Sequence, residues 1–288
     1  MNNSKALFQD FINELTLNEH RDELQSMAYL VFEHVLSLAK LDILTSKEIT
    51  ITPEQKNKLK EIADRLNNHE PVQYILEEAL FNGRLFKVNS SVLIPRPETE
   101  ELIAAILKLT NNKTQLHILD IGTGSGCIPI TLALESKQSK VSATDISEQS
   151  LAVASKNATY LQAHVNFLKH DILTEELPFT NLDIIVSNPP YIALEEKSTM
   201  NSNVVAHEPH LALFVEDNDP LIFYRTIAQK AKHALKTGGL LIVEINERYG
   251  TEVAQLFSNN NFVEIEILKD LSGKDRIVKG ILKSSQYG

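Results

Sequence analysis

One short segment of the chain combines residue types suited to holding a planar NH₂ group: Ser187-Asn188-Pro189-Pro190-Tyr191. Two consecutive prolines fix φ and remove two backbone N–H donors. The Asn188 side-chain carbonyl and the Pro189 backbone carbonyl are therefore expected to accept both hydrogens of an amine or amide, with Tyr191 against the planar group. An amide nitrogen is a poor nucleophile, and such acceptors would direct its lone pair by positioning and electrostatics. A plain strand-ending turn would need neither Asn nor the aromatic residue.

A second segment brings alternating glycines directly after an apolar stretch: His117-Ile118-Leu119-Asp120-Ile121-Gly122-Thr123-Gly124-Ser125-Gly126-Cys127. Glycine permits close approach of a ligand to the backbone. A following helix would offer free N–H groups that suit a carboxylate or a phosphate. The spacing is G-x-G-x-G, whereas a dinucleotide-binding loop has G-x-G-x-x-G. A tight turn without a ligand is the alternative, and three glycines in five residues disfavour it.

Two aspartates follow the next predicted strands. Asp145 comes about 20 residues after the glycine loop, where a carboxylate can accept hydrogen bonds from ribose hydroxyls. It could instead cap the following helix. Asp171 could accept a hydrogen bond from an adenine amino group, and a role as a loop or cap residue is nearly as well supported.

The elements that must position these residues alternate between strand and helix. This pattern predicts an α/β domain with a largely parallel sheet, whose ligands bind at the carboxyl ends of the strands. Strands are predicted at 115–121, 141–145, 164–168, 182–187, 240–245, 263–268 and 276–282, and helices at 125–134, 147–161, 220–236 and 251–258. A loop of about 30 residues after Ser187 is unusually long and is expected to carry function.

The chain before residue 80 has the apolar spacing of helices. Helices are predicted at 8–15, 19–41, from Pro53 towards 66, and at 71–78, with a capping box at Thr52. Asn82-Gly83 between apolar residues indicates a hairpin. We therefore predict a helical domain at 1–79, a connecting hairpin at 80–94 and the α/β domain at 95–288.

Composition narrows the class of protein. The chain has 288 residues, 43% of them hydrophobic, and a formal net charge of −10. This charge disfavours a protein that holds nucleic acid by its phosphates. The one cysteine, Cys127, allows no intrachain disulfide, and the histidines show no metal-ligand spacing. With no apolar stretch near the roughly 20 residues of a membrane span, we expect a soluble cytoplasmic protein.

These motifs resemble known methyltransferases. Asn-Pro-Pro-Tyr after a glycine-loop strand resembles enzymes that methylate exocyclic or amide NH₂ groups, including adenine-N6 DNA enzymes. The segment Ile94-Pro95-Arg96-Pro97-Glu98-Thr99-Glu100 is similar to the I-P-R-P-[ED]-T-E segment of the HemK/PrmC family, the release factor glutamine methyltransferases. The resemblance covers most of the chain, including the segments 71–76, 82–83, 208–213 and 275–280.

The resemblance implies a seven-stranded Rossmann-like class I methyltransferase domain and a small N-terminal helical bundle domain that helps recognise the release factor. It implies S-adenosylmethionine as cofactor, S-adenosylhomocysteine as product, no metal, and methyl transfer to N5 of the glutamine in the Gly-Gly-Gln motif of class 1 release factors. A monomer without nucleic acid or membrane contacts is expected. Carried over by position, the cofactor-binding residues are Gly122, Thr123, Gly124, Ser125, Gly126, Asp145, Asp171, Ile172 and Asn188. The substrate-binding residues are Asn188, Pro189, Pro190 and Tyr191, of which Asn188, Pro189 and Tyr191 are catalytic.

Two positions depart from the family pattern: Glu77 stands where glycine is frequent, and Ile172 where an aromatic residue is frequent. Arg96 to Thr99 are expected near the mouth of the active site or as a helix cap. The alternatives are a ribosomal-protein glutamine methyltransferase, an adenine-N6 DNA methyltransferase, a nicotinamide-dependent dehydrogenase and a non-catalytic cofactor-binding module. The 97–100 segment disfavours the ribosomal-protein enzyme, and the net charge disfavours the DNA enzyme. The glycine spacing disfavours the dehydrogenase, and the intact Asn-Pro-Pro-Tyr segment disfavours a non-catalytic module.

Overall fold

The computed structural model describes residues 2–110, 115–136, 138–200 and 202–284. The chain forms two compact units. The first contains the residues up to Glu78 together with helix α9 (Ser202–His207), and the second contains the remainder from Ala79 onwards.

The first unit is a helical bundle with one two-stranded sheet. Its apolar core is formed mainly by α1, α2, α4 and α5. The Thr52 capping box is confirmed, since the Gln55 N–H donates to Thr52 Oγ1 (3.1 Å) and the Thr52 N–H donates to Gln55 Oε1 (2.9 Å). The predicted single helix at 19–41 is wrong, because Ser37 adopts a left-handed conformation that ends α2. The elements are β1 (Asn2–Asn3), α1 (Ser4–Glu14), α2 (Arg21–Leu36), α3 (Lys40–Leu44), β2 (Glu48–Ile49), α4 (Pro53–Asn67) and α5 (Val72–Leu76).

Helix α5 ends at a strained residue. Glu77, its C-terminal cap, has φ 56° and ψ 27°. The left-handed region is unfavourable for residues with a Cβ, and glycine is the usual residue at such a helix end. The departure from the family pattern at Glu77 therefore coincides with a backbone conformation that glycine would adopt without strain.

A short hairpin follows, formed by β3 (Glu78–Phe81) and β4 (Arg84–Lys87). Asn82 and Gly83 connect the strands with φ 47° and 73°, values that suit a two-residue hairpin turn. The two strands span 78–87, so the observed hairpin begins before the predicted range of 80–94 and ends well before that range does; residues 88–96 contain turns and a bend but no strand.

The second unit is built on a sheet of seven strands in the order β12-β13-β11-β8-β5-β6-β7. Strands β11, β8, β5, β6 and β7 are parallel, and β13 runs antiparallel to both β11 and β12. The predicted α/β class and the seven-stranded sheet are confirmed. The strands are β5 (His117–Ile121), β6 (Lys140–Asp145), β7 (Val165–Lys169), β8 (Leu182–Ser187), β11 (Leu235–Glu244), β12 (Phe262–Lys269) and β13 (Asp275–Leu282).

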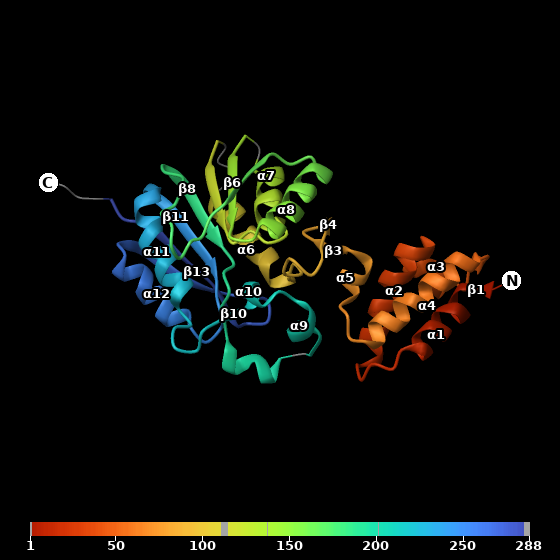
Figure 1. Ribbon diagram of the computed structural model, residues 1–288. Coiled ribbons are helices and arrows are strands. Elements are labelled where there is room, and N and C mark those ends of the chain that lie inside the picture. Colours follow the sequence, from red (N-terminus) through yellow and green to blue (C-terminus); the bar gives the residue numbers. More distant parts are fainter. Residues whose placement is uncertain (1, 111–114, 137, 201, 285–288) are drawn as a thin grey trace. The chain divides into compact units, whose positions relative to one another are not determined.

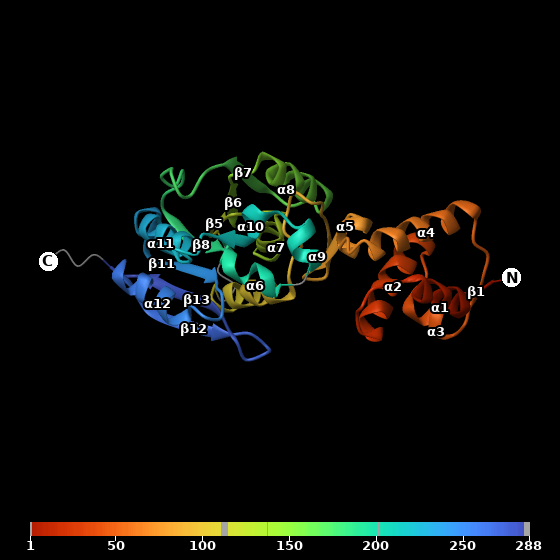
Figure 2. The same ribbon diagram turned by 60° about the horizontal axis from the view of Figure 1, so that its bottom comes forward.

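Helices cover both faces of this sheet (Figures 1 and 2). Alternate residues of β8 enter opposite cores: Ile185 packs with α11 and α12, whereas Ile184 and Val186 pack with α6, α7 and α8. Burial on both faces explains why this strand is nearly all apolar. The helices are α6 (Pro97–Thr110), α7 (Cys127–Glu135), α8 (Glu148–Tyr160), α11 (Ile222–Ala234) and α12 (Gly250–Asn259).

The long segment after β8 is more ordered than the predicted loop. Strands β9 (Ile192–Ala193) and β10 (Phe214–Val215) pair in parallel, and the chain between them forms the 3₁₀ helix η1 (Leu194–Thr199), α9 and α10 (His210–Leu213). Within the described ranges, no helix has the length and apolarity needed to cross a membrane.

Candidate active site

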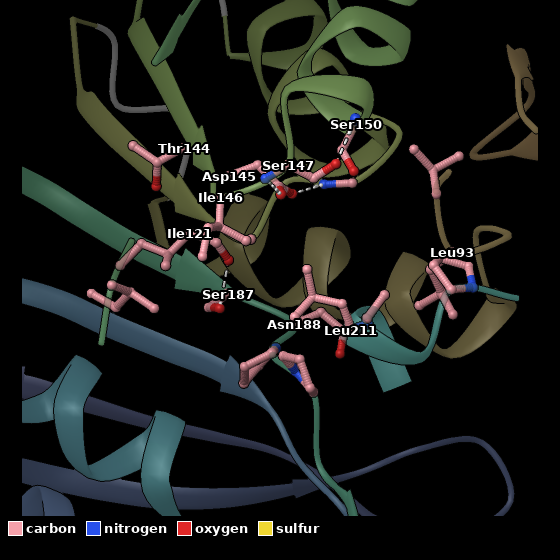
Figure 3. Close-up of a pocket in the computed structure, with 18 of the residues that line it drawn as sticks. Leu93, Ile121, Thr144, Asp145, Ile146, Ser147, Ser150, Ser187, Asn188 and Leu211 are labelled. Carbon is pink, nitrogen blue, oxygen red and sulfur yellow. Dashed lines mark hydrogen bonds between the residues drawn. The ribbon is translucent and has the colours of Figure 1, made fainter. Parts of the chain in front are cut away.

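A cavity of about 580 Å³ lies in the second unit, where β5, β6 and β8 end. The last residues of these strands, Ile121, Asp145 and Ser187, all line it. Figure 3 shows Asp145 and Ser147 on one side of the cavity and Asn188 and Leu211 on the opposite side. The structure thus brings together residues from the two motifs that sequence analysis singled out.

The three glycines of the loop have two different roles. Gly122 and Gly124 line the cavity with φ 75° and 55°, and no described atom lies within 4 Å of the position that a Cβ would take on either. Gly126 instead packs against helices, because a Cβ there would lie 2.9 Å from Ile130 Cδ1 and 3.0 Å from Ala154 Cβ. Gly122 and Gly124 therefore leave open space beside a potential ligand, while Gly126 allows α7 and α8 to approach.

Asp145 holds this loop in place. Its Oδ2 accepts a hydrogen bond from the Gly124 N–H, and its Oδ1 accepts one from the Ser147 N–H, both at 2.9 Å. Burial raises the pKa of the Asp145 carboxyl, and the hydrogen bonds from the two N–H groups oppose that rise. The carboxylate lines the cavity and retains lone pairs for a ligand with hydroxyl groups.

Asp171 and Ile172 also line the cavity, and Ile172 is buried. The Asp171 carboxylate already accepts hydrogen bonds from the Leu173 N–H (2.9 Å) and the Thr174 hydroxyl (2.8 Å). These local bonds are those of a turn-capping aspartate. These hydrogen bonds agree with Asp171 acting as a loop or cap residue. Its predicted hydrogen bond to an adenine amino group stays a prediction.

The Asn-Pro-Pro-Tyr segment is tied to a buried carboxylate. Asn188 Nδ2 donates to Thr99 Oγ1 (3.2 Å), Thr99 donates to Glu244 Oε2 (2.7 Å), and the Tyr191 hydroxyl donates to Glu244 Oε1 (3.3 Å). Asn188, Pro189 and Pro190 line the cavity. Tyr191 is not among the lining residues of the described chain, and neither are Thr123, Ser125 and Gly126.

Three buried residues to which sequence analysis assigned no role lie beside the two motifs without lining the cavity. Glu244 ends β11 and is buried, which raises the pKa of its carboxyl to about 7. Asp120 lies in β5, two residues before Gly122, and burial likewise raises the pKa of its carboxyl to about 7. Asn157 of α8 donates to the carbonyl oxygens of Ser125 and Lys87, both at 2.9 Å, and so joins the glycine loop to β4. The one feature of the sequence that could have indicated a structural role for Asn157 is its position among the apolar residues on the buried face of α8.

Another carboxylate, that of Glu208, joins two walls of the cavity. It accepts hydrogen bonds from the Arg96 guanidinium and from the Ile94 N–H (3.2 Å), and its side chain is almost fully buried. Leu93, which precedes Ile94, and Pro209, which follows Glu208, both line the cavity. Arg96 therefore acts as the anchor of the 93–96 segment. Among the described residues, no three His, Cys, Asp or Glu side chains are grouped to hold a metal ion.

Comparisons with known proteins decide the family. Residues 8–76 match the model of the PrmC N-terminal domain, and residues 99–212 match that of the methyltransferase small domain. The release factor glutamine methyltransferase of Bacteroides thetaiotaomicron is 44% identical over 258 residues, which cover 89% of this chain and 92% of that protein. The enzyme of that name from Flavobacterium psychrophilum is 41% identical over 272 residues, 93% of this chain and 95% of the relative. This chain belongs to the release factor glutamine methyltransferase family.

Solved structures support the same fold. A methyltransferase from Pyrococcus furiosus superimposes with a TM-score of 0.51 at 15% identity, covering 81% of this chain and all of that one. At this identity the likeness concerns the fold alone, and it agrees with the predicted class I methyltransferase architecture. Within the family, the cavity between the glycine loop and the Asn-Pro-Pro-Tyr segment is the candidate active site.

Proposed function

We propose that this protein transfers a methyl group from S-adenosylmethionine to the side-chain amide nitrogen (N5) of the glutamine in the Gly-Gly-Gln motif of class 1 release factors. Membership of the release factor glutamine methyltransferase family supports this substrate. The observation that carries the proposal is that Asn188 and Pro189 line the same cavity as Asp145, with Asn188 on the side opposite Asp145 (Figure 3). A planar NH₂ acceptor and a cofactor cradle thus face one another.

The residues of the cavity fit S-adenosylmethionine. A volume of about 580 Å³ lies within the range of small-molecule sites. The open space beside Gly122 and Gly124 would admit a ligand against the backbone, and the Asp145 carboxylate would accept hydrogen bonds from ribose hydroxyls. Ile172 would offer an apolar surface to the adenine ring. When bound, the cofactor supplies a methyl group activated by attachment to a sulfonium.

The protein's own part in the reaction is to orient the glutamine amide. The Asn188 Oδ1 and the Pro189 carbonyl oxygen accept the two N–H hydrogens of the substrate, which turns the nitrogen lone pair towards the methyl donor. The acceptors also stabilise the positive charge that develops on the nitrogen as it is alkylated. The nitrogen then becomes acidic and releases one of its hydrogens as a proton. No step requires a metal.

The first unit supplies a surface for the release factor in this proposal. Its match to the PrmC N-terminal domain over residues 8–76 supports a shared role across the family. A protein substrate needs a larger contact area than a cavity of this size provides, since specific protein interfaces bury about 800 Å² per partner. We assign residues 1–79 to recognition of the release factor and residues 95–288 to catalysis.

Mass spectrometry of a release factor tests the proposal directly. The protein and S-adenosylmethionine are incubated with a purified class 1 release factor, and in parallel with a variant in which alanine replaces the Gly-Gly-Gln glutamine. We expect one methyl increment on the glutamine peptide and none on the alanine control. No increment, despite measured cofactor binding, would refute the assigned substrate.

A further inference from the structure

A buried hydroxyl links the substrate-binding amide to the carboxylate at the end of β11. Thr99 lies in the first turn of α6 with 2% of its surface exposed, and Glu244 is 1% exposed. Thr99 Oγ1 lies 2.7 Å from Glu244 Oε2 and 3.2 Å from Asn188 Nδ2. Three side chains from separate parts of the sequence thus form one chain of hydrogen bonds that ends at the cavity.

The chemistry of the three groups fixes the direction of these bonds. An ionised carboxylate can only accept, so the Thr99 hydroxyl must donate its single hydrogen to Glu244. Thr99 then offers only lone pairs to Asn188, which must turn its NH₂ group towards Thr99. The Asn188 Oδ1 is left for the substrate. An inverted Asn188 would set its NH₂ donor against the NH₂ donor of a substrate glutamine, and no hydrogen bond could form.

The same carboxylate also holds the other end of the motif. Glu244 Oε1 accepts a hydrogen bond from the Tyr191 hydroxyl at 3.3 Å. One buried group therefore contacts Tyr191 directly and Asn188 through Thr99. Burying a carboxylate costs stability unless it is well paired, so a site that needs only packing would be better served by an apolar residue.

We infer that Thr99 and Glu244 are positioning residues that set the amide orientation of Asn188, so that its carbonyl oxygen faces the substrate NH₂ group. This inference rests on the proposed glutamine methylation. It gives Thr99, one residue of the Ile94–Glu100 segment, a task beyond capping α6.

The test compares three residues at position 99 in the full-length protein. Thr99→Val keeps the branched shape and removes the hydroxyl, whereas Thr99→Ser keeps the hydroxyl. Initial rates are measured with saturating S-adenosylmethionine and varied release factor, at a pH well above the Glu244 pKa of about 7 so that the carboxylate is ionised. Cofactor affinity is measured separately by calorimetry.

We expect Thr99→Val to lower kcat by about tenfold or more, the effect of one oriented hydrogen bond. Its cofactor Kd should stay within about twofold of the wild-type value, since Thr99 does not line the cavity. Thr99→Ser should retain most of the wild-type kcat. If Thr99→Val does not fold, Thr99→Ala removes the same hydroxyl with less crowding. A near-normal kcat without the hydroxyl, or an equal loss in Thr99→Ser, would overturn the inference.

A second readout does not depend on the release factor. The side-chain NH₂ resonances of Asn188 in ¹⁵N NMR spectra, assigned with Asn188→Ala, should show slow hydrogen exchange in the wild type and in Thr99→Ser, and faster exchange in Thr99→Val. If the wild type methylates no release factor but shows this pattern, the proposed substrate fails and the positioning inference stands. If exchange is the same in all three proteins, the positioning inference fails.

Discussion

Replacing Asp145 by alanine tests the proposed cofactor cradle. In the structure this residue is half-buried, and its carboxylate accepts hydrogen bonds from the Gly124 and Ser147 N–H groups. Alanine removes both bonds and the acceptor that we assign to the cofactor ribose. Cofactor binding should weaken for two reasons: the ribose hydroxyls lose a charged partner, and the Gly124 backbone loses its anchor.

The size of the effect follows from hydrogen bonds to charged groups, which contribute about 1–3 kcal/mol. Cofactor Kd should therefore rise by about 5- to 150-fold. The free energy of unfolding should fall less than two lost hydrogen bonds suggest, because the burial that raises the Asp145 pKa is itself a cost that alanine removes.

Calorimetric titration with S-adenosylhomocysteine measures this affinity without turnover. Asp171→Ala is the matched control, since it removes a second carboxylate from the same cavity whose oxygens already accept local hydrogen bonds. Thermal unfolding of both variants verifies that they fold. An unchanged Kd in Asp145→Ala would refute the ribose assignment. An equal loss in Asp171→Ala would show that Asp145 has no special role among the carboxylates of the cavity and would support the predicted ligand contact at Asp171.

Three further predictions concern other residues of the site and the first unit. Asn188→Ala should abolish most methyl transfer while cofactor Kd changes by less than Asp145→Ala, and single-turnover rates with calorimetry check both. Burial raises the Glu244 pKa from 4.5 to about 7, so its contribution to stability is complete below pH 4.5 and is lost as the pH rises through 7. Wild type should therefore lose up to about 3 kcal/mol relative to Glu244→Gln between pH 4.5 and pH 8 in denaturant titrations, and parallel curves would contradict this. Glu77→Gly should raise the free energy of unfolding by about 1 kcal/mol, because it relieves the left-handed cap of α5; a loss of stability in chemical denaturation would show that contacts of the Glu77 side chain outweigh the strain.

Local signals in the sequence predicted most elements of the second unit. The glycine loop marks the junction of β5 and α7, and the run of apolar residues at 182–187 marks a strand buried on both faces. The boundaries of helices in the first unit were predicted less well, since α2 ends at Leu36 and α3 begins at Lys40. Ser37 ends the predicted helix at 19–41 because its backbone is left-handed. Serine does not require this conformation, so the local sequence does not predict that the helix ends there.

The long segment after β8 shows a second limit. Strands β9 and β10 contain two residues each and pair although 20 residues separate them in the sequence. A two-residue strand has no periodicity to detect. Only the surrounding tertiary structure makes such a pairing favourable.

The sequence by itself determined the family, the fold class and the two motifs that meet at the cavity. These features depend on residue types at close spacing, such as the prolines that fix the backbone beside Asn188 and the glycines that open it at 122 and 124. Tertiary structure alone decided which distant groups act on these motifs. Glu244 lies 145 residues from Thr99, and Glu208 lies 112 residues from Arg96, yet each pair forms a hydrogen bond. The positions at which strands end in the folded sheet determine which of these groups lie close enough to pair. In the sequence, a Glu that will be buried cannot be distinguished from one that will be exposed, because burial depends on how the rest of the chain packs.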